Sequence, residues 1–262
     1  MLPFTHAFFP GNSYPMSKHT GETQVEPGHR PRQRPGRSGR PAPAGVRPRP
    51  GRTVTGADDW QRTLNHAVEA LRDPGWGVID GFLPDSLWRE LARQAREGFE
   101  RGDFHPAGIG EGAAVTTGVR GDAIRWLYPQ AAQGAERAFW ERIEQLRLAI
   151  NRNLWLGLME YECHYARYPE GAFYQRHVDR LRDRPERTVT LITYLNEGWT
   201  EADGGALRIF PQGSEPVEIP PLGGRAVIFL SEELEHEVLP ARRPRLALTG
   251  WFRRRAYQGR LV

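Results

Sequence analysis

The chain of 262 residues carries 36 Lys and Arg against 32 Asp and Glu, a net charge of +4, and is long enough for one domain with its own core. Its single cysteine excludes an intrachain disulfide and a cysteine-rich zinc site. No apolar run is long enough to span a membrane, and the N-terminus lacks the basic start of a secretory signal. We therefore expect a cytoplasmic protein.

The first 53 residues differ in composition from the rest of the chain. They hold nine basic and two acidic residues, ten prolines and seven glycines, which leaves a net charge of −3 for the remainder. Such a segment buries too little apolar surface to offset the entropy of ordering. We predict a disordered basic tail over residues 1–53 and a folded domain over 54–262.

The tail has three readings. Its charge fits an arm that binds nucleic acid, but no aromatic residue interleaves the arginines between Arg30 and Arg52 as a base-stacking surface requires. The other readings are a solvated extension, or translation from a start codon upstream of the true one. We expect no nucleic-acid partner except through this tail.

The first half of the domain is predicted to be mostly helical. Apolar residues recur at helical spacing in three segments, namely 58–71, 85–99 with the face Leu87, Leu91, Ala95 and Phe99, and 131–153 with the face Ala138, Phe139, Ile143, Leu146 and Ile150. Short strands are predicted at 76–80 and around Ile124 and Trp126. The segment between them, 102–121, is rich in Gly, Ala and Thr and is interpreted as a mobile loop or hairpin over a site.

After Leu154 the pattern changes to short strands separated by turn residues. We predict eight of them, at 159–168, 173–179, 187–196, 205–210, 217–220, 225–231, 236–240 and 245–254. Strands of this number and spacing are typical of a two-sheet jelly roll, also called a double-stranded β-helix. The predicted fold class is therefore α+β, a jelly-roll barrel braced by the N-terminal helices.

Three side chains in the predicted barrel form a candidate metal site. Alternate residues of a strand share a face, so His177 and Asp179 can bind one ion while Val178 turns away. His236 follows 59 residues later and supplies a second imidazole only if the strands roll into a barrel. Two histidines and one carboxylate, with the opposite positions open, are the ligand set of Fe(II) oxygenases.

Arg245 is the fourth unusual residue. It lies on the last predicted strand, where Ala247, Thr249 and Trp251 share its face and no acidic residue does. A buried arginine needs a partner. Its planar guanidinium suits a carboxylate held by two contacts, so a bound dicarboxylate would provide one.

These residues, with the motifs around them, resemble the catalytic domain of the 2-oxoglutarate- and iron-dependent prolyl hydroxylases, closest to the Egl-nine group and its bacterial relatives. The matching motifs, in chain order, are Arg120-Gly121-Asp122, Trp126, Tyr168-Pro169, His177-Val178-Asp179, Thr193-Tyr194-Leu195-Asn196, Gly204 to Pro211, His236-Glu237-Val238, Arg245, Thr249 and Trp251. The resemblance covers about residues 60–252. Compared with the family, this chain has one residue fewer in the segment before His177 and one residue fewer in the segment before His236.

The resemblance implies the following roles. His177, Asp179 and His236 hold Fe(II). The cosubstrate 2-oxoglutarate chelates the iron, and its far carboxylate meets Arg245 and the hydroxyl of Tyr194. Tyr168, Leu207 and Thr249 complete the cosubstrate pocket, and Phe229 is an apolar wall. Oxygen is the second cosubstrate, ascorbate is supportive, and no separate catalytic acid or base is expected.

A second group of residues is predicted at the substrate side of the site. It comprises Arg120, Asp122, Trp126, Arg187 and Trp251. Arg187 matches a family arginine, and we hypothesise that it pairs with Asp122 to close the loop over a peptide. His164 is interpreted either as a pocket residue or as a hydrogen-bonded core histidine, and His66 and His105 as surface residues.

The leading functional hypothesis is hydroxylation of a prolyl residue in a protein, with release of succinate and CO2. Bacterial members of the resembling group point to translation components, and elongation factor Tu is the first candidate. The alternatives are an oxygenase that acts on free proline, another small molecule or a nucleic-acid base, and a non-catalytic jelly-roll binding module.

Overall fold

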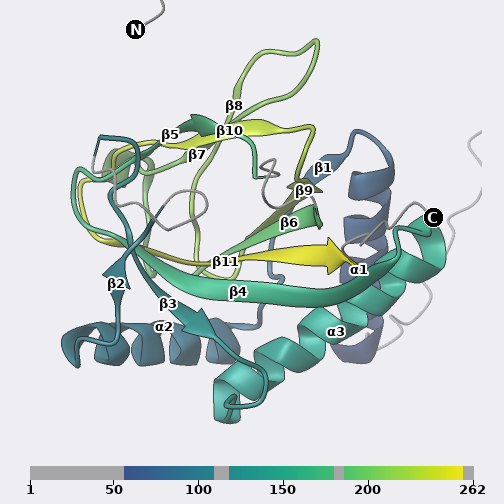
Figure 1. Ribbon diagram of the computed structural model, residues 1–262, viewed down its shortest axis with the longest axis horizontal. Coiled ribbons are helices and arrows are strands. Elements are labelled where there is room, and N and C mark those ends of the chain that lie inside the picture. The colour runs from purple at the N-terminus through teal and green to yellow at the C-terminus, as the bar shows by residue number, and fades with distance from the viewer. Residues whose placement is uncertain (1–55, 109–117, 180–185, 256–262) are drawn as a thin grey trace, which may run out of the picture. The chain divides into compact units, whose positions relative to one another are not determined.

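The computed structural model describes residues 56–108, 118–179 and 186–255 (Figure 1). The predicted tail, residues 1–53, lies outside the described residues, and so does the centre of the predicted loop over the site, residues 109–117.

Antiparallel pairing joins the strands of the described residues into two sheets (Figure 1). The larger sheet has the order β1 (Trp76–Ile79), β9 (Ala226–Leu230), β6 (Arg187–Tyr194), β11 (Arg245–Arg254), β4 (Leu158–Tyr168), β3 (Ala123–Leu127), β2 (His105–Pro106). The smaller sheet has the order β5 (Tyr174–His177), β10 (Glu235–Val238), β7 (Leu207–Phe210), β8 (Val217–Ile219). All eight strands predicted after Leu154 are present, and β2 is an additional short strand.

The helices of the described chain are α1 (Gly56–Arg72), α2 (Asp85–Glu100) and α3 (Gly134–Leu154), with a short 3-10 turn η1 (Glu201–Asp203). In α3 the residues Phe139, Ile143, Leu146 and Ile150 are buried, at the spacing that puts them on one helix face. They belong to one apolar cluster with residues of α1, α2 and the larger sheet. The helices therefore pack against one face of that sheet.

The other face of the larger sheet meets the smaller sheet. Along β11, Leu246, Leu248 and Phe252 enter the cluster shared with the helices, whereas Ala247 enters the cluster between the sheets. This alternation confirms the two strand faces predicted for this segment. Because β6, β9 and β11 are covered on both faces, their side chains are almost all buried.

Two local predictions were wrong in part. Leu91 and Ala95 of the face predicted for α2 are buried, but Phe99 is not. On α2 the buried stripe runs through Trp88, Leu91, Ala92 and Ala95, while Phe99 is 37% exposed and its ring lies 3.8 Å from the guanidinium carbon of Arg167. The indole Nε1 of Trp88 donates a hydrogen bond to Asp85 Oδ1 at 3.0 Å, so this large residue is buried with its polar atom satisfied.

The second error concerns the strand predicted at 173–179. It ends at His177, so Asp179 lies beyond the ladder. The loss of strand geometry also changes Val178, which was expected to turn away but borders the same cavity as the two ligands.

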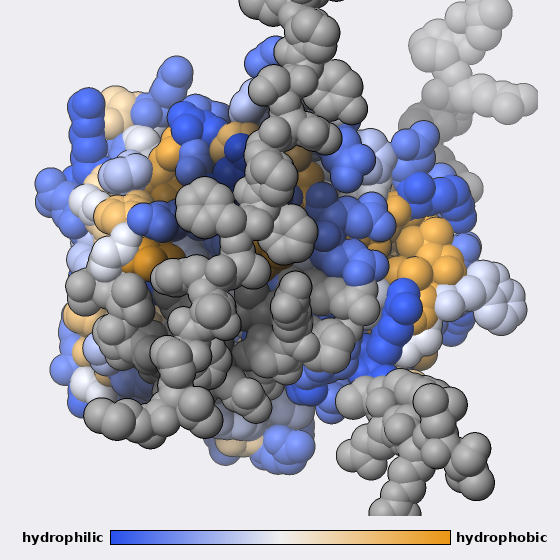
Figure 2. Space-filling view, turned by 45° about the horizontal axis from the view of Figure 1, so that its top comes forward, coloured by the Kyte–Doolittle hydropathy of each residue, from blue (hydrophilic) through white to orange (hydrophobic). Residues whose placement is uncertain are grey.

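One face of the molecule is drawn by hydropathy in Figure 2. Figure 2 shows hydrophilic side chains between separate apolar patches on the face that it presents. None of the described helices is long and apolar enough to cross a membrane.

Candidate metal centre and cosubstrate pocket

The two histidines of the candidate metal centre come from neighbouring strands of the smaller sheet. β5 and β10 pair antiparallel, and His177 lies directly opposite His236 in their register. Opposed residues project to the same face, so the imidazole centroids lie only 4.3 Å apart. Strand pairing therefore brings together two histidines, His177 and His236, that are 59 residues apart in the sequence.

Asp179 completes the centre from just beyond β5. Its Oδ1 lies 3.6 Å from His177 Nε2, and its Oδ2 lies 3.6 Å from His236 Nε2. One ligand atom of each residue lies within 4.8 Å of the others. The structure thus brings together the three residues that the sequence predicted, although Asp179 is not on the strand.

Hydrogen bonds orient each imidazole toward this centre. His177 Nδ1 is 2.7 Å from the carbonyl oxygen of Gln175, and His236 Nδ1 is 3.1 Å from that of Leu234. A carbonyl only accepts, so the neutral form of either ring carries its proton on Nδ1 and keeps a lone pair on Nε2. Burial lowers the pKa of His236, which keeps this imidazole neutral.

Asp179 is held in its charged form. Burial by itself raises the pKa of this carboxyl, but the charge of His236 and His177 when these rings are protonated, together with a hydrogen bond from Thr190, holds it well below its usual value. Two imidazoles and one carboxylate are the donor set that suits Fe(II). Their chemistry therefore fits the predicted metal.

A cavity of about 210 Å³ opens beside these ligands, between the two sheets. Its walls include most of the residues predicted for the cosubstrate and substrate, namely Tyr168, Leu207, Arg245, Thr249, Arg120, Trp126, Arg187 and Trp251. Three predicted residues do not line it. Phe229, predicted as an apolar wall, is fully buried with its ring centroid 4.8 Å from that of His236. Asp122 lies behind Arg120, and the ring of Tyr194 lies 5.1 Å from the guanidinium carbon of Arg245.

Arg245 forms one end of the cavity and is only 1% exposed. Its Nε donates to the carbonyl of Gly205 at 2.9 Å, but its Nη2 has no hydrogen-bond partner among the described residues. The buried hydroxyl of Tyr194 lies near the Arg245 guanidinium but likewise forms no hydrogen bond of normal geometry among the described residues. Burial raises the pKa of Tyr194 to about 12, so this hydroxyl remains a donor. Two buried donors without acceptors indicate a missing anionic ligand.

Gly205 makes the close approach of Arg245 possible. It adopts a φ of +67°, which side chains rarely tolerate, and an added Cβ would lie 2.7 Å from the Cβ of Ala241 and 3.4 Å from the Cδ of Arg245. A substitution at Gly205 would therefore move the guanidinium or its acceptor.

Arg120 and Asp122 form a buried ion pair at the rim of the cavity. Two hydrogen bonds of 2.7 and 2.6 Å join the guanidinium to the carboxylate. Burial by itself lowers the pKa of Arg120, but the bonds to Asp122 hold it above its usual value. The same guanidinium lies 4.5 Å from the ring of Tyr174, which stacks on the metal-site His177 at 3.7 Å.

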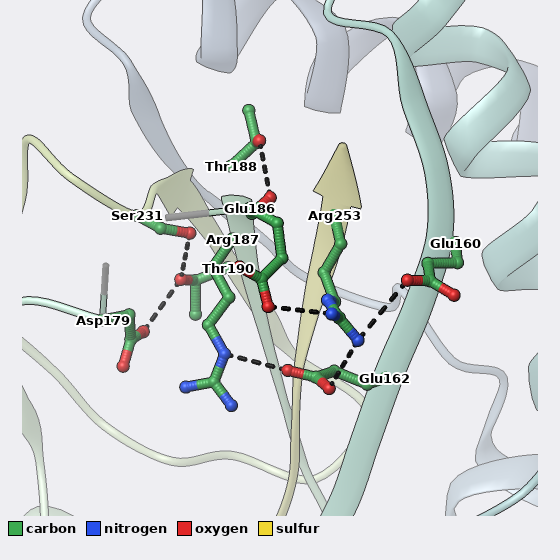
Figure 3. A network of polar contacts seen from close by, with 9 residues as sticks. All are labelled: Glu160, Glu162, Asp179, Glu186, Arg187, Thr188, Thr190, Ser231 and Arg253. Atoms are coloured by element: carbon green, nitrogen blue, oxygen red, sulfur yellow. Dashed lines mark hydrogen bonds and ion pairs between the residues drawn. The ribbon is translucent and has the colours of Figure 1, made fainter. Parts of the chain in front are cut away.

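Arg187 also lines the cavity and does not pair with Asp122. Its Nε donates to Glu162 at 2.9 Å, and its guanidinium carbon lies 3.5 Å above the ring of Trp251. Figure 3 shows that Glu162 also meets Arg253, which in turn contacts Glu186 and Glu160. In this structure Arg187 and Asp122 do not form the hypothesised pair, because each residue has a nearer partner of opposite charge.

His164 fits both of its readings, since it is buried and also lines the cavity. Its ring lies between Trp126 and Trp251, at 5.0 and 5.6 Å, and its Nδ1 is 3.1 Å from the carbonyl of Tyr165. Burial lowers the pKa of His164 to about 4. His66 is exposed as predicted; His105 is exposed too but borders the cavity.

Several residues of the site were missed from the sequence. The cavity is also lined by Tyr174, Val238 and the β2 residues His105 and Pro106. Ser231 lies behind Asp179, which it reaches through the hydroxyl of Thr190. A signal was available for Tyr174, an aromatic residue three positions before a ligand. None was available for Ser231, because its contact with the site depends on the pairing of β6 with β9.

Comparison with known proteins agrees with this geometry. Residues 163–253 match the 2OG-Fe(II) oxygenase superfamily. Over 201 residues, 71% of this chain, the sequence is 32% identical to the hypoxia-inducible factor prolyl hydroxylase of Caenorhabditis elegans. It is 31% identical to the mouse prolyl hydroxylase EGLN3 over 72% of this chain and 82% of that protein. The chain belongs to the 2OG-Fe(II) oxygenase superfamily.

Solved structures place this oxygenase domain among the prolyl hydroxylases. A prolyl-4-hydroxylase of Pseudomonas putida is 46% identical, with a TM-score of 0.68 over 74% of this chain and 100% of that one. A prolyl hydroxylase of Trichoplax adhaerens, solved with a peptide of hypoxia-inducible factor, is 29% identical, with a TM-score of 0.70 over 75% of this chain and 91% of that one.

The likeness supports the jelly-roll arrangement of the two sheets. The matched region spans 28% of the worm protein and 46% of human Egl nine homolog 1, less than half of either relative.

Proposed function

We propose that this chain is an Fe(II)- and 2-oxoglutarate-dependent dioxygenase that hydroxylates a prolyl residue of a protein. The observation that carries the proposal is the position of Arg245. Its unpartnered Nη2 and the three candidate iron ligands belong to the same small cavity. A metal site alone does not require a buried guanidinium, but an oxygenase that binds a dicarboxylate beside the metal does.

His177, Asp179 and His236 would hold the iron. Bound iron supplies the oxidation by O2, which is coupled to conversion of 2-oxoglutarate into succinate and CO2. The residues of this chain orient the reactants and keep water away. Ascorbate would support the activity by keeping the iron reduced.

The far carboxylate of 2-oxoglutarate would accept hydrogen bonds from Arg245 Nη2 and from the hydroxyl of Tyr194. These two donors are buried, so a charged acceptor is favoured strongly over water. Tyr168, Leu207 and Thr249 line the cavity and would contact the rest of the molecule. No residue is needed as a separate acid or base.

The substrate would enter between Arg120 and Arg187, which border the cavity together with Trp126 and Trp251. Aromatic rings beside fixed cations suit a proline ring flanked by peptide groups. The Trichoplax relative, which was solved with a peptide, supports a polypeptide substrate for this chain. Elongation factor Tu is the first protein to test.

A turnover assay tests the proposal. The purified chain is incubated with Fe(II), 2-oxoglutarate, ascorbate and lysate of the host or purified elongation factor Tu, and proteins are searched by mass spectrometry for one added oxygen on proline. The expected result is succinate together with hydroxyproline. An Arg245→Met variant serves as the inactive control.

The other outcomes of this assay separate the alternatives. Succinate with hydroxylated free proline or an oxidised nucleic-acid base would identify a small-molecule or nucleic-acid oxygenase. If the assay yields no succinate and no modified residue, the result contradicts the proposal and favours a binding module.

We further propose that residues 54–262 form the catalytic domain and that residues 1–53 are an accessory tail. A chain that lacks residues 1–53 is then expected to keep its rate of 2-oxoglutarate turnover. We also infer that α1, α2 and α3 brace the barrel, because they share an apolar cluster with the larger sheet. Leu146→Ala, at a fully buried position of α3, should lower the free energy of unfolding by about 2–5 kcal/mol.

A further inference from the structure

Asp179 differs from the two histidine ligands in how its backbone is held. His177 and His236 lie in paired strands of the smaller sheet. Asp179 follows the end of β5, in a bend without a ladder partner among the described strands. Its side chain must nevertheless stay in one place to act as a ligand, because metal affinity depends on fixed ligand geometry. A contact from another element has to supply that restraint.

The contact comes from the larger sheet. Thr190, at the centre of β6, donates its hydroxyl hydrogen to Asp179 Oδ2 at 2.8 Å. The hydroxyl of Ser231, which follows β9, lies 2.9 Å from the same Thr190 oxygen (Figure 3). Since Thr190 already gives its only hydrogen to Asp179, Ser231 must be the donor in the second bond. The three residues form a directed chain, Ser231 to Thr190 to Asp179.

Both hydroxyl residues are fully buried, with 0% exposure. Their positions are fixed by backbone pairing, because Thr190 lies opposite Phe229 and Trp251 in the two neighbouring strands, and Ser231 N donates to Thr188 O at 3.0 Å. A buried chain of hydrogen bonds is stronger when each member polarises the next. The larger sheet therefore restrains the side chain of Asp179, which β5 does not restrain.

We propose that Thr190 and Ser231 are positioning residues that tether Asp179 across the two sheets and so complete the metal site. The inference rests on the proposed metal centre but goes beyond it, since it assigns to the larger sheet the placement of one ligand. Neither hydroxyl touches the metal or the cosubstrate in this assignment. They act through the carboxylate, by occupying Oδ2 and fixing the side-chain rotamer.

The test is metal affinity, measured by titration of the purified full chain with Co(II) and by the visible absorption of the bound ion. Thr190→Val keeps the shape of the side chain and removes the hydroxyl. It is expected to weaken Co(II) binding by about 10–100-fold and to change the Co(II) spectrum. Thr190→Ser, which restores the hydroxyl, should return within about 3-fold of the unaltered chain.

The chain offers a matched control three residues away. Thr193 lies on the opposite face of β6, is also 0% exposed, and its hydroxyl has no partner among the described residues. Thr193→Val makes the same chemical change in the same strand without touching Asp179. It should leave Co(II) affinity unchanged.

A second variant keeps the test decisive if Thr190→Val does not fold. Ser231→Ala removes only the outer hydroxyl and should weaken Co(II) binding by a few-fold, with an unchanged circular dichroism spectrum. Equal affinities for the Thr190→Val and Thr193→Val chains, or full affinity in Ser231→Ala, would overturn the tether. Failure of the unaltered chain to bind Co(II) would overturn the metal centre itself, which distinguishes the two proposals.

Discussion

The two ends of the cavity differ in how far their polar groups are satisfied. At the metal end, each imidazole bonds a backbone carbonyl and Asp179 accepts a hydroxyl hydrogen. At the other end, Arg245 Nη2 and the Tyr194 hydroxyl are buried without partners among the described residues. The metal end is thus assembled by the fold, while the Arg245 end is complete only when an anion is bound.

This difference has an energetic consequence. Unpaired buried donors destabilise the folded chain by about 1–3 kcal/mol each, and a bound carboxylate removes that penalty. Arg245 and Tyr194 are thus the side chains that gain most from a bound carboxylate. The three metal ligands already have hydrogen-bond partners in the fold.

The largest effect is expected from removing a metal ligand. His236→Ala should weaken Co(II) binding by more than about 100-fold, because no described side chain can replace the buried imidazole. His66→Ala, which removes an exposed histidine, is the control and should bind Co(II) normally. Calorimetric titration measures both. Retained binding in His236→Ala would show that the two ends do not differ as described.

Arg245→Met tests the opposite end. Binding of 2-oxoglutarate, measured by titration in the presence of Mn(II), should weaken by about 100-fold, since a buried guanidinium paired with a carboxylate is lost. Chemical unfolding of the ligand-free chain should show unchanged or increased stability, because an uncompensated buried charge has been removed.

Arg242→Met, at the exposed neighbouring arginine, is the control for Arg245 and should change neither quantity. A large loss of stability in ligand-free Arg245→Met would contradict the view that this end is incomplete.

The cavity wall between the ends predicts a dependence on pH. Burial lowers the pKa of His164 to about 4; Asp122 opposes this, and Arg120 and Arg187 add to it. Below about pH 6.5 the unfolded chain binds a proton on this histidine that the folded chain does not. The contribution of neutral His164 to the free energy of unfolding is therefore complete above that pH and is lost as the pH falls toward 4. The loss amounts to about 1–3 kcal/mol.

Urea unfolding at a series of pH values measures this contribution. His164→Gln should flatten the profile between pH 6.5 and 4. Exposed His66→Gln should not alter it. Identical profiles for His164→Gln and the unaltered chain would show that His164 titrates normally.

The smallest effect is expected from Tyr194→Phe, which removes one of the two open donors. It should weaken 2-oxoglutarate binding by about 5-fold, the value of one hydrogen bond, with Co(II) binding unchanged. Tyr165→Phe is a matched control, since this fully buried tyrosine lies in the cluster shared with the helices. An effect of Tyr165→Phe equal to that of Tyr194→Phe would argue against a direct contact with the cosubstrate.

The sequence by itself determined what local periodicity can encode. Alternation along β11 placed Arg245, Thr249 and Trp251 on the cavity face, and helical spacing identified the buried face of α3. Residue chemistry also limited the metal, because two histidines and one aspartate suit few ions. These features depend on residues close together in the chain.

Only the tertiary structure decided the contacts between elements. It showed that Asp179 lies beyond its strand and is held by Thr190 of the other sheet, and that Arg187 pairs with Glu162 rather than Asp122. On α2 it buried Trp88 in place of Phe99. Each of these outcomes depends on which neighbour a strand or helix packs against, and the periodicity of a single segment does not contain that information.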